Sequence, residues 1–220
     1  MVEHVYRSAA AAARVDAVIV ATDDPRVAEA VMAFEGTVVM TRGDHATGTD
    51  RLAEVADALT GDIVINVQGD EPLMTADAID AVVGLLDDRP GDLMATLRRR
   101  IEDPADLTTA SVVKLVVDRD GYALYFSRSA IPFVRPGQPI PVLWRHLGLY
   151  AYRRTFLQTL AGLAPTPLEQ AEGLEQLRAL EHGYRIGTAE TLADTIGVDT
   201  PEDLERVRRV MTTVAAGTAT

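Results

Sequence analysis

The chain has 220 residues, a formal net charge of −12 and no cysteine. The length suits one folded core, and the missing thiols exclude disulfides, cysteine nucleophiles and cysteine-based zinc sites. The acidic charge argues against nucleic acid or an anionic membrane as a partner, because both select basic surfaces. No stretch has the length and apolarity of a membrane span, and the first residues lack the pattern of a signal peptide, so we expect a soluble cytoplasmic protein without membrane insertion.

Helical and strand patterns alternate along the first half of the chain. Apolar spacing predicts helices at 2–14, 25–36, 50–59 and 75–86, and short β-type runs predict buried strands at 17–21, 37–40 and 63–67. Short connections between alternating helices and strands indicate a mostly parallel sheet with helices on both faces.

The second half of the chain changes character. Strand patterns occur at 93–97, 111–118, 122–127 and 146–152, and Arg119-Asp120-Gly121 predicts a hairpin turn. Four prolines exclude regular structure from 132–141. A capping box at 166–169 predicts a helix ending at Gly183, and the same signature at 200–203 opens a last helix to about residue 211. We expect 212–220 to be a disordered tail.

Two acidic positions are candidate metal ligands. Asp70 follows the strand at 63–67, within Gln68-Gly69-Asp70-Glu71-Pro72, and Asp199 precedes the last helix. Ligands of open α/β sheets bind beyond the carboxyl ends of the strands, and Mg²⁺ is commonly held by one or two carboxylates plus substrate phosphates. The alternative is that both residues only shape the starts of helices.

The polar loop at 41–50 is a candidate nucleotide site. It is rich in Gly, Thr and Asp and lies between a strand and a helix, where backbone N–H groups and hydroxyls can contact phosphate, ribose or base. It is not a P-loop, because the Gly-Lys-Ser/Thr ending is absent. The alternative is a solvated loop.

A third group of polar residues suits an acidic, hydroxyl-rich ligand. His146 and Tyr150 are an even number of residues apart, so on a strand they share one face, and Arg128 is a nearby cation in the hairpin region. Glu175 and Gln176 border the buried stripe of the helix after 166 and can point into the same cleft. Ordinary surface polarity is the alternative for all five.

Five segments together resemble one family. They are TRGDHATGTDRL at 41–52, VQGDEP at 67–72, GYALYFSR at 121–128, RHLG at 145–148 and GVDTPEDL at 197–204. In this order they resemble the 3-deoxy-manno-octulosonate (Kdo) cytidylyltransferases, the CMP-Kdo synthetases of lipopolysaccharide assembly. The similarity runs from about residue 2 to about residue 211.

The resemblance implies an α/β fold and a reaction. The fold is a Rossmann-like nucleotidyltransferase sheet, mostly parallel but mixed, in a single domain at 1–211, with a β-hairpin dimerisation subdomain at about 111–152. The nucleotidyltransferase reaction converts CTP and Kdo into CMP-Kdo and pyrophosphate, with Mg²⁺ as cofactor and a homodimer as the assembly. The runner-up substrates are other acidic sugars, such as 8-amino-Kdo or a sialic-type acid.

The resemblance also assigns roles residue by residue. The metal-binding, catalytic positions are Asp70 and Asp199. The nucleotide-binding positions are Arg42, Asp44, Thr47, Gly48 and Gln68. The sugar-binding positions are Arg128, His146, Tyr150, Glu175 and Gln176.

One family feature is absent from the sequence. The family begins with a strand and a basic triphosphate loop, whereas this chain opens at the helix that follows them, and its only lysine is Lys114. We therefore expect an N-terminally truncated member that turns over slowly or not at all by itself. A non-catalytic remnant is the alternative outside the enzyme class.

Overall fold

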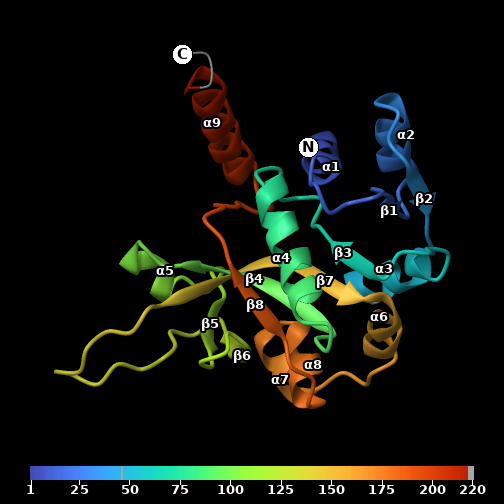
Figure 1. Cartoon of the computed structure of the whole chain (residues 1–220). Coiled ribbons are helices and arrows are strands. Elements are labelled where there is room, and N and C mark those ends of the chain that lie inside the picture. Colours follow the sequence, from blue (N-terminus) through green and yellow to red (C-terminus); the bar gives the residue numbers. More distant parts are fainter. Residues whose placement is uncertain (46, 218–220) are drawn as a thin grey trace. The chain divides into compact units, whose positions relative to one another are not determined.

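The computed structural model describes residues 1–45 and 47–217 of the chain, and their contacts form two compact units (Figure 1). The first unit holds Met1–Thr41, Val67–Asp80 and the described part of Leu192–Thr220. The second unit holds Arg42–Asn66 and Ala81–Thr191. The single domain at 1–211 stays a prediction. Among the described residues, no helix combines the length and the apolar character that a membrane crossing requires.

The first unit is built around a pair of short strands. Its elements are α1 (Val2–Ala10), β1 (Val20–Thr22), α2 (Pro25–Ala33), β2 (Val38–Met40), the start of α4 (Ala76–Asp88) and α9 (Pro201–Gly217). β1 and β2 pair in parallel, with Val20 opposite Val38. Asp24 caps α2, because its carboxylate accepts a hydrogen bond from the Arg26 N–H at 2.8 Å, and Pro25 occupies the first turn.

The first helix is shorter than its sequence pattern predicts. α1 ends at Ala10, whereas the apolar stripe and the alanines predict a helix to residue 14. The backbone N–H groups of Ala13 and Arg14 donate to the Asp80 carboxylate at 2.9 and 2.8 Å. This tertiary contact satisfies donors that would otherwise continue the helix, so it overrides the local propensity.

The second unit contains a six-stranded sheet with helices packed on it. Its elements are α3 (Gly48–Ala56), β3 (Ile63–Asn66), the rest of α4, β4 (Met94–Arg100), α5 (Pro104–Thr108), β5 (Lys114–Val117), β6 (Ala123–Ser127), β7 (Trp144–Arg153), α6 (Arg154–Ala161), α7 (Pro167–Glu172), α8 (Gln176–Glu181) and β8 (Gly187–Glu190). The strand order is β6-β5-β7-β4-β8, and β3 also pairs with β7.

The directions of these strands make the sheet mixed. β3, β4 and β5 each pair antiparallel with β7, and β8 pairs parallel with β4, so these four run one way while β7 and β6 run the other. β4 follows one edge of β7, whereas β3 and β5 share the opposite edge at 150–153 and 144–145. The expected mixed α/β sheet is confirmed, but the mostly parallel pairing predicted from the first half is wrong for this sheet: among its described strands only β4 and β8 pair in parallel, because β7 lies between β4 and the strands β3 and β5.

The core of the second unit lies between its sheet and helices. Val64, Leu115, Phe126 and Leu157 come from β3, β5, β6 and α6, and each is at most 6% exposed. Full burial of such a side chain stabilises the fold by about 1.5–3 kcal/mol.

The helix predicted from 166 to 183 is wrong as one element. Gly173 adopts the left-handed conformation at φ 61°, and the Leu174 N–H donates to the Glu169 carbonyl at 3.1 Å, so α7 ends and α8 begins after a turn. Leu168, which the single helix would bury, is 41% exposed. The break places Glu175 and Gln176 at the start of α8.

The hairpin region consists of two paired strands and a long irregular segment. Gly121 makes the predicted turn at φ 81°, and β5 and β6 pair within the six-stranded sheet. Residues 129–143 form no helix or strand, as the prolines predict, and extend as a long arm between β6 and β7 (Figure 1). At the other end, α9 continues beyond the predicted 211 to Gly217, and the remaining tail, 218–220, lies outside the described residues.

Candidate active site

A backbone hydrogen bond in the first unit joins the segments of the two predicted metal ligands. The Val198 N–H donates to the Asp70 carbonyl at 3.0 Å, so Asp199 follows directly after the residue bonded to Asp70. Gln68 belongs to the same turn, since its carbonyl accepts from the Glu71 N–H at 3.3 Å. The structure therefore brings Gln68, Asp70 and Asp199 into one local region.

The start of α9 leaves the Asp199 carboxylate outside the helix cap. Asp203 closes a capping box with Thr200: its carboxylate accepts from the Thr200 N–H at 3.0 Å and from the hydroxyl at 2.8 Å. The Thr200 hydroxyl holds the pKa of Asp203 below its ordinary value. Asp203 caps the helix, so the cap does not need Asp199. This removes the main argument for the alternative that Asp199 only shapes the start of the last helix.

The donor set at Asp70 and Asp199 fits a hard divalent cation. Both offer carboxylate oxygens, with Asp70 partly buried and Asp199 exposed. Within the described residues, no cluster of three or more histidine, cysteine or acidic side chains is placed to hold a metal ion. A site with two carboxylates suits Mg²⁺, which keeps several waters and takes substrate phosphate oxygens.

The candidate nucleotide loop leads into α3 in the second unit. The Thr47 hydroxyl accepts from the Asp50 N–H at 3.2 Å and caps the helix. Gly48 is the first helical residue, and a Cβ atom placed on it would meet no atom within 4 Å. The N-terminus of α3 therefore carries backbone donors beside open space, which suits an anionic or polar ligand.

One glutamate from α3 holds this loop. Glu54 lies 3.5 Å from the Arg42 Nε, accepts from the Arg42 N–H and hydrogen-bonds His45 Nε2, whose side chain is almost fully buried. The hydrogen bond from His45 lowers the pKa of Glu54. Asp44 is exposed, with its carboxylate 3.7 Å from the Arg42 Nε. Glu54 thus links both ends of the segment 42–45 to the helix.

Aromatic rings line one face of β7. The ring centroids of His146 and Tyr150 are 5.3 Å apart, because β7 has two extra residues between them and they pair with Arg98 and Thr96 on β4. Phe126 approaches His146 edge-on at 5.0 Å, and Tyr152 stacks on Tyr150 at 5.9 Å. His146 and Tyr150 are partly exposed and offer polar groups on this face, whereas Phe126 and Tyr152 are buried beside them.

Arg128 lies against α7 in the structure. Its guanidinium donates to the carbonyls of Glu172 at 2.8 Å, Ala110 at 3.2 Å and Gly173 at 3.4 Å. Its backbone N–H donates to the Glu172 carboxylate at 2.9 Å. Arg128 is thus anchored at the end of α7, and its hydrogen bonds do not draw it toward His146 or Tyr150.

Glu175 and Gln176 connect the sugar-site candidates with the nucleotide loop. The Thr49 hydroxyl, one residue after Gly48, donates to the Glu175 carboxylate at 2.8 Å. Burial and the Glu175 charge raise the pKa of Tyr152, which places that phenol beside the same pair. Gln176 is 5% exposed, and its amide nitrogen has no hydrogen-bond partner within the described chain. A buried donor left unpaired is costly, so this nitrogen is suited to a ligand acceptor.

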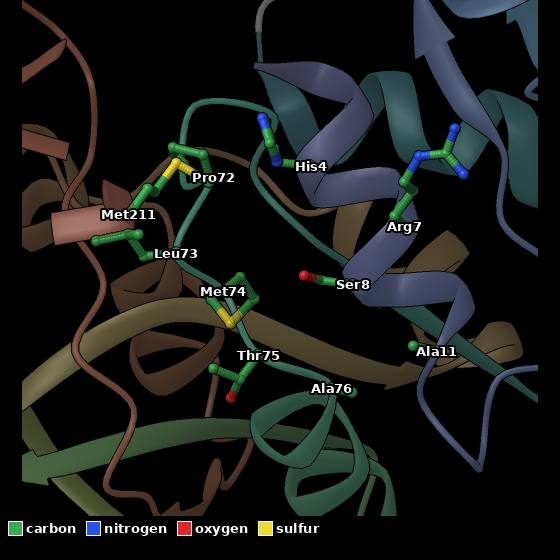
Figure 2. Close-up of a pocket in the computed structure, with 10 residues that line it drawn as sticks. All are labelled: His4, Arg7, Ser8, Ala11, Pro72, Leu73, Met74, Thr75, Ala76 and Met211. Carbon is green, nitrogen blue, oxygen red and sulfur yellow. The ribbon is translucent and has the colours of Figure 1, made fainter. Parts of the chain in front are cut away.

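A separate cavity of about 480 Å³ lies within the first unit. Figure 2 shows its lining, which comes from α1 and the following Ala11, the segment 72–76 and Met211 of α9. Pro72, Leu73 and Met74 give it an apolar wall, and Arg7 is its charged residue. None of the predicted site residues lines it.

Comparison with known proteins decides the family. Residues 1–186 match the family model described as cytidylyltransferase. A 3-deoxy-manno-octulosonate cytidylyltransferase of Pelobacter propionicus is 52% identical over 218 residues, an alignment covering 94% of this chain and 86% of the relative. The chain belongs to this family.

Further members agree in sequence and fold. The 3-deoxy-manno-octulosonate cytidylyltransferase of Solibacter usitatus is 51% identical, with 96% of this chain and 83% of the relative covered. The solved structure of a CMP:2-keto-3-deoxy-manno-octonic acid synthetase complexed with CTP superposes with a TM-score of 0.91 at 46% identity, covering 96% of this chain and 87% of that one. The expected nucleotidyltransferase fold of the cytidylyltransferase family is confirmed.

Sequence reasoning missed four residues that support the candidate site of this cytidylyltransferase. They are Thr49, Glu54, Thr96 and Lys114. Thr96 and Lys114 are polar residues within apolar strand segments, and this pattern predicts a buried polar contact. Thr49 and Glu54 carry no such signal, because their partners are known only from the tertiary fold.

Proposed function

We propose that the chain is a cytidylyltransferase that forms CMP-Kdo and pyrophosphate from CTP and Kdo, for lipopolysaccharide biosynthesis. Its support is an identity of 52% to a curated cytidylyltransferase of this specificity and the fold shared with a synthetase complexed with CTP. The structural observation that carries the proposal is the Val198–Asp70 hydrogen bond, which joins the two acidic segments.

In this reaction the protein positions the two substrates and forms no covalent bond with them. The anomeric hydroxyl oxygen of Kdo attacks the α-phosphorus of CTP, the bond to the bridging oxygen of the β-phosphate breaks, and pyrophosphate leaves as the hydroxyl proton passes to solvent. Asp70 and Asp199 would hold Mg²⁺, which when bound neutralises charge on the phosphates. In-line orientation of the two substrates supplies most of the remaining rate enhancement.

The loop before α3 is proposed to bind cytidine. Thr47 and Gly48 offer a hydroxyl and backbone donors at the helix N-terminus, and Glu54 holds Arg42 in place. Arg42 and Asp44 supply further polar groups for the base and ribose. The open space beside Gly48 supports the assignment, because a larger residue there would project into it.

The sugar is proposed to bind along β7 and the start of α8. His146, Tyr150 and Glu175 suit its hydroxyls, and the unpaired amide nitrogen of Gln176 supports a polar ligand at this point. Arg128 is proposed to attract the sugar carboxylate. Its guanidinium donates to carbonyl oxygens, so its hydrogen bonds do not neutralise its charge.

A homodimer and a cytoplasmic location are also part of the proposal. The arm at 129–143 carries Phe133 and Ile140, which are 84% and 75% exposed. Such large apolar side chains on an extended segment favour burial against a second copy.

Pyrophosphate release from CTP and Kdo with Mg²⁺ tests the proposal. We expect Asp70→Asn and Asp199→Asn each to reduce release by about 10²–10³-fold, a loss typical of removing charge stabilisation from a transferring group. Asp77→Asn is the matched control, because Asp77 is an exposed aspartate of the same unit at the start of α4. The Pelobacter propionicus relative serves as positive control. Release by Asp70→Asn at the rate of an active parent would contradict the proposal.

A further inference from the structure

A buried threonine contacts the predicted sugar-binding histidine. Thr96 lies on β4 and is fully buried, and its hydroxyl oxygen is 2.8 Å from His146 Nε2. The same oxygen lies 2.8 Å from the Leu149 carbonyl and 3.3 Å from the Leu147 carbonyl. Thr96 therefore has three polar neighbours on β7.

These neighbours meet at a bulge in β7. Thr96 pairs with Tyr150, whereas the next residue, Leu97, pairs with Leu147, so Gly148 and Leu149 are extra residues on β7. At this bulge the Leu149 carbonyl accepts a hydrogen bond from the Thr96 hydroxyl. Bulges commonly redirect a side chain at functional sites.

The hydrogens of this group can be assigned by counting. A threonine hydroxyl has one hydrogen, and a carbonyl oxygen can only accept, so the Thr96 hydrogen points to the carbonyls of β7. The hydroxyl oxygen then faces His146 as an acceptor, and Nε2 must carry a hydrogen to complete the bond. A neutral imidazole has one N–H, so Nδ1 is left as an acceptor.

The surroundings keep the ring neutral and in place. Burial lowers the pKa of His146 to about 3, so the ring is uncharged at physiological pH. Phe126 and Tyr150 contact the ring from two elements at centroid distances of 5.0 and 5.3 Å. A charged imidazolium, which would donate from both nitrogens, is therefore disfavoured.

We propose that Thr96 is a positioning residue that fixes His146 as the Nε2–H tautomer and makes its Nδ1 a hydrogen-bond acceptor. Resting on the proposed function, this assigns His146 to a hydroxyl of the sugar, because only a donor can bond to Nδ1. The carboxylate of the sugar is an acceptor and must bind elsewhere, at a cation such as Arg128. The threonine thus contributes to substrate specificity without touching substrate.

The first test reads the tautomer directly and needs no substrate. The chain has four histidines, so ¹⁵N-histidine labelling and long-range ¹H–¹⁵N spectra give a small set of ring signals, with His146 assigned by its loss in His146→Asn. We expect the parent to show His146 protonated at Nε2, Thr96→Ser to keep that state, and Thr96→Val to shift it toward Nδ1–H. Protonation at Nδ1 in the parent would overturn the proposal.

The second test reads substrate recognition. We expect Thr96→Val to raise the KM for Kdo about tenfold, the effect of one neutral hydrogen bond, with the KM for CTP unchanged and Thr96→Ser close to the parent. Thr188→Val is the matched control, because Thr188 is a buried threonine paired with Thr96 on β8.

The outcomes separate this inference from the proposed function. A parent that consumes CTP without forming CMP-Kdo would refute the function, while the NMR result would still decide the role of Thr96. Equal KM changes for CTP and Kdo, or equal effects of Thr96→Val and Thr188→Val, would reduce Thr96 to a structural residue and overturn the inference.

Discussion

Lys114 is predicted to be essential for the stability of the second unit. It is fully buried at the start of β5, and its ammonium donates to the carbonyls of Thr109 at 3.0 Å, Val112 at 2.7 Å and Arg128 at 2.5 Å. Burial lowers its pKa from the ordinary value. Lys114→Met keeps most of the side-chain volume but removes every one of these donors.

The size of the effect follows from these contacts. A hydrogen bond to a charged group contributes about 1.5–3 kcal/mol, so three give a gross stabilisation of about 5–9 kcal/mol. Taking an ammonium out of water costs several kcal/mol, which offsets much of this gain. We therefore expect Lys114→Met to reduce the free energy of unfolding by about 3 kcal/mol.

Urea denaturation followed by circular dichroism measures this change. Arg119→Met is the matched control, because it removes one positive charge from an exposed residue in the adjacent hairpin turn. We expect the control to stay within about 0.5 kcal/mol of the parent. Equal denaturation midpoints for Lys114→Met and Arg119→Met would refute the reasoning.

Three further predictions concern the nucleotide loop and the arm. Glu54→Gln weakens the contacts to His45 and Arg42, so we expect the KM for CTP to rise while the KM for Kdo changes little; unchanged KM for CTP would contradict the role of Glu54. The hydrogen bond from His45 lowers the pKa of Glu54 in the folded protein, so the Glu54 carboxylate stabilises the loop fully at pH values above the ordinary glutamate pKa. This stabilisation is lost as the pH falls through the lowered pKa. Acid titration of CTP binding should show the loss in the parent and not in Glu54→Gln. On the arm, Phe133→Ser with Ile140→Ser should convert a dimer into a monomer in sedimentation equilibrium, and an unchanged mass would exclude the arm as the contact.

Local sequence signals predicted most of the elements. Asp24-Pro25, the turn at Gly121 and the alternating apolar runs each act within a few residues, so helices, strands and the hairpin follow from the pattern. The wrong end of the first helix arose from a distant contact. Asp80 takes the donors of Ala13 and Arg14 and ends α1 early, and no local rule anticipates that contact.

The candidate site shows the same limit. The parity of His146 and Tyr150 predicted a shared face, and the bulge preserves it because it adds two residues rather than one. The break at Gly173 changed the position of Glu175, although a glycine inside a helical pattern is itself a warning. The bonds Thr49–Glu175 and Thr96–His146 join positions far apart in the chain, and only the fold reveals them.

The identity of the product tests the central claim most directly. The chain would be incubated with CTP, Mg²⁺ and equal concentrations of Kdo and a nine-carbon sialic acid, and the nucleotide sugar would be identified by mass spectrometry. The account predicts CMP-Kdo with one pyrophosphate per product. CMP-sialic acid as the main nucleotide sugar would contradict the account.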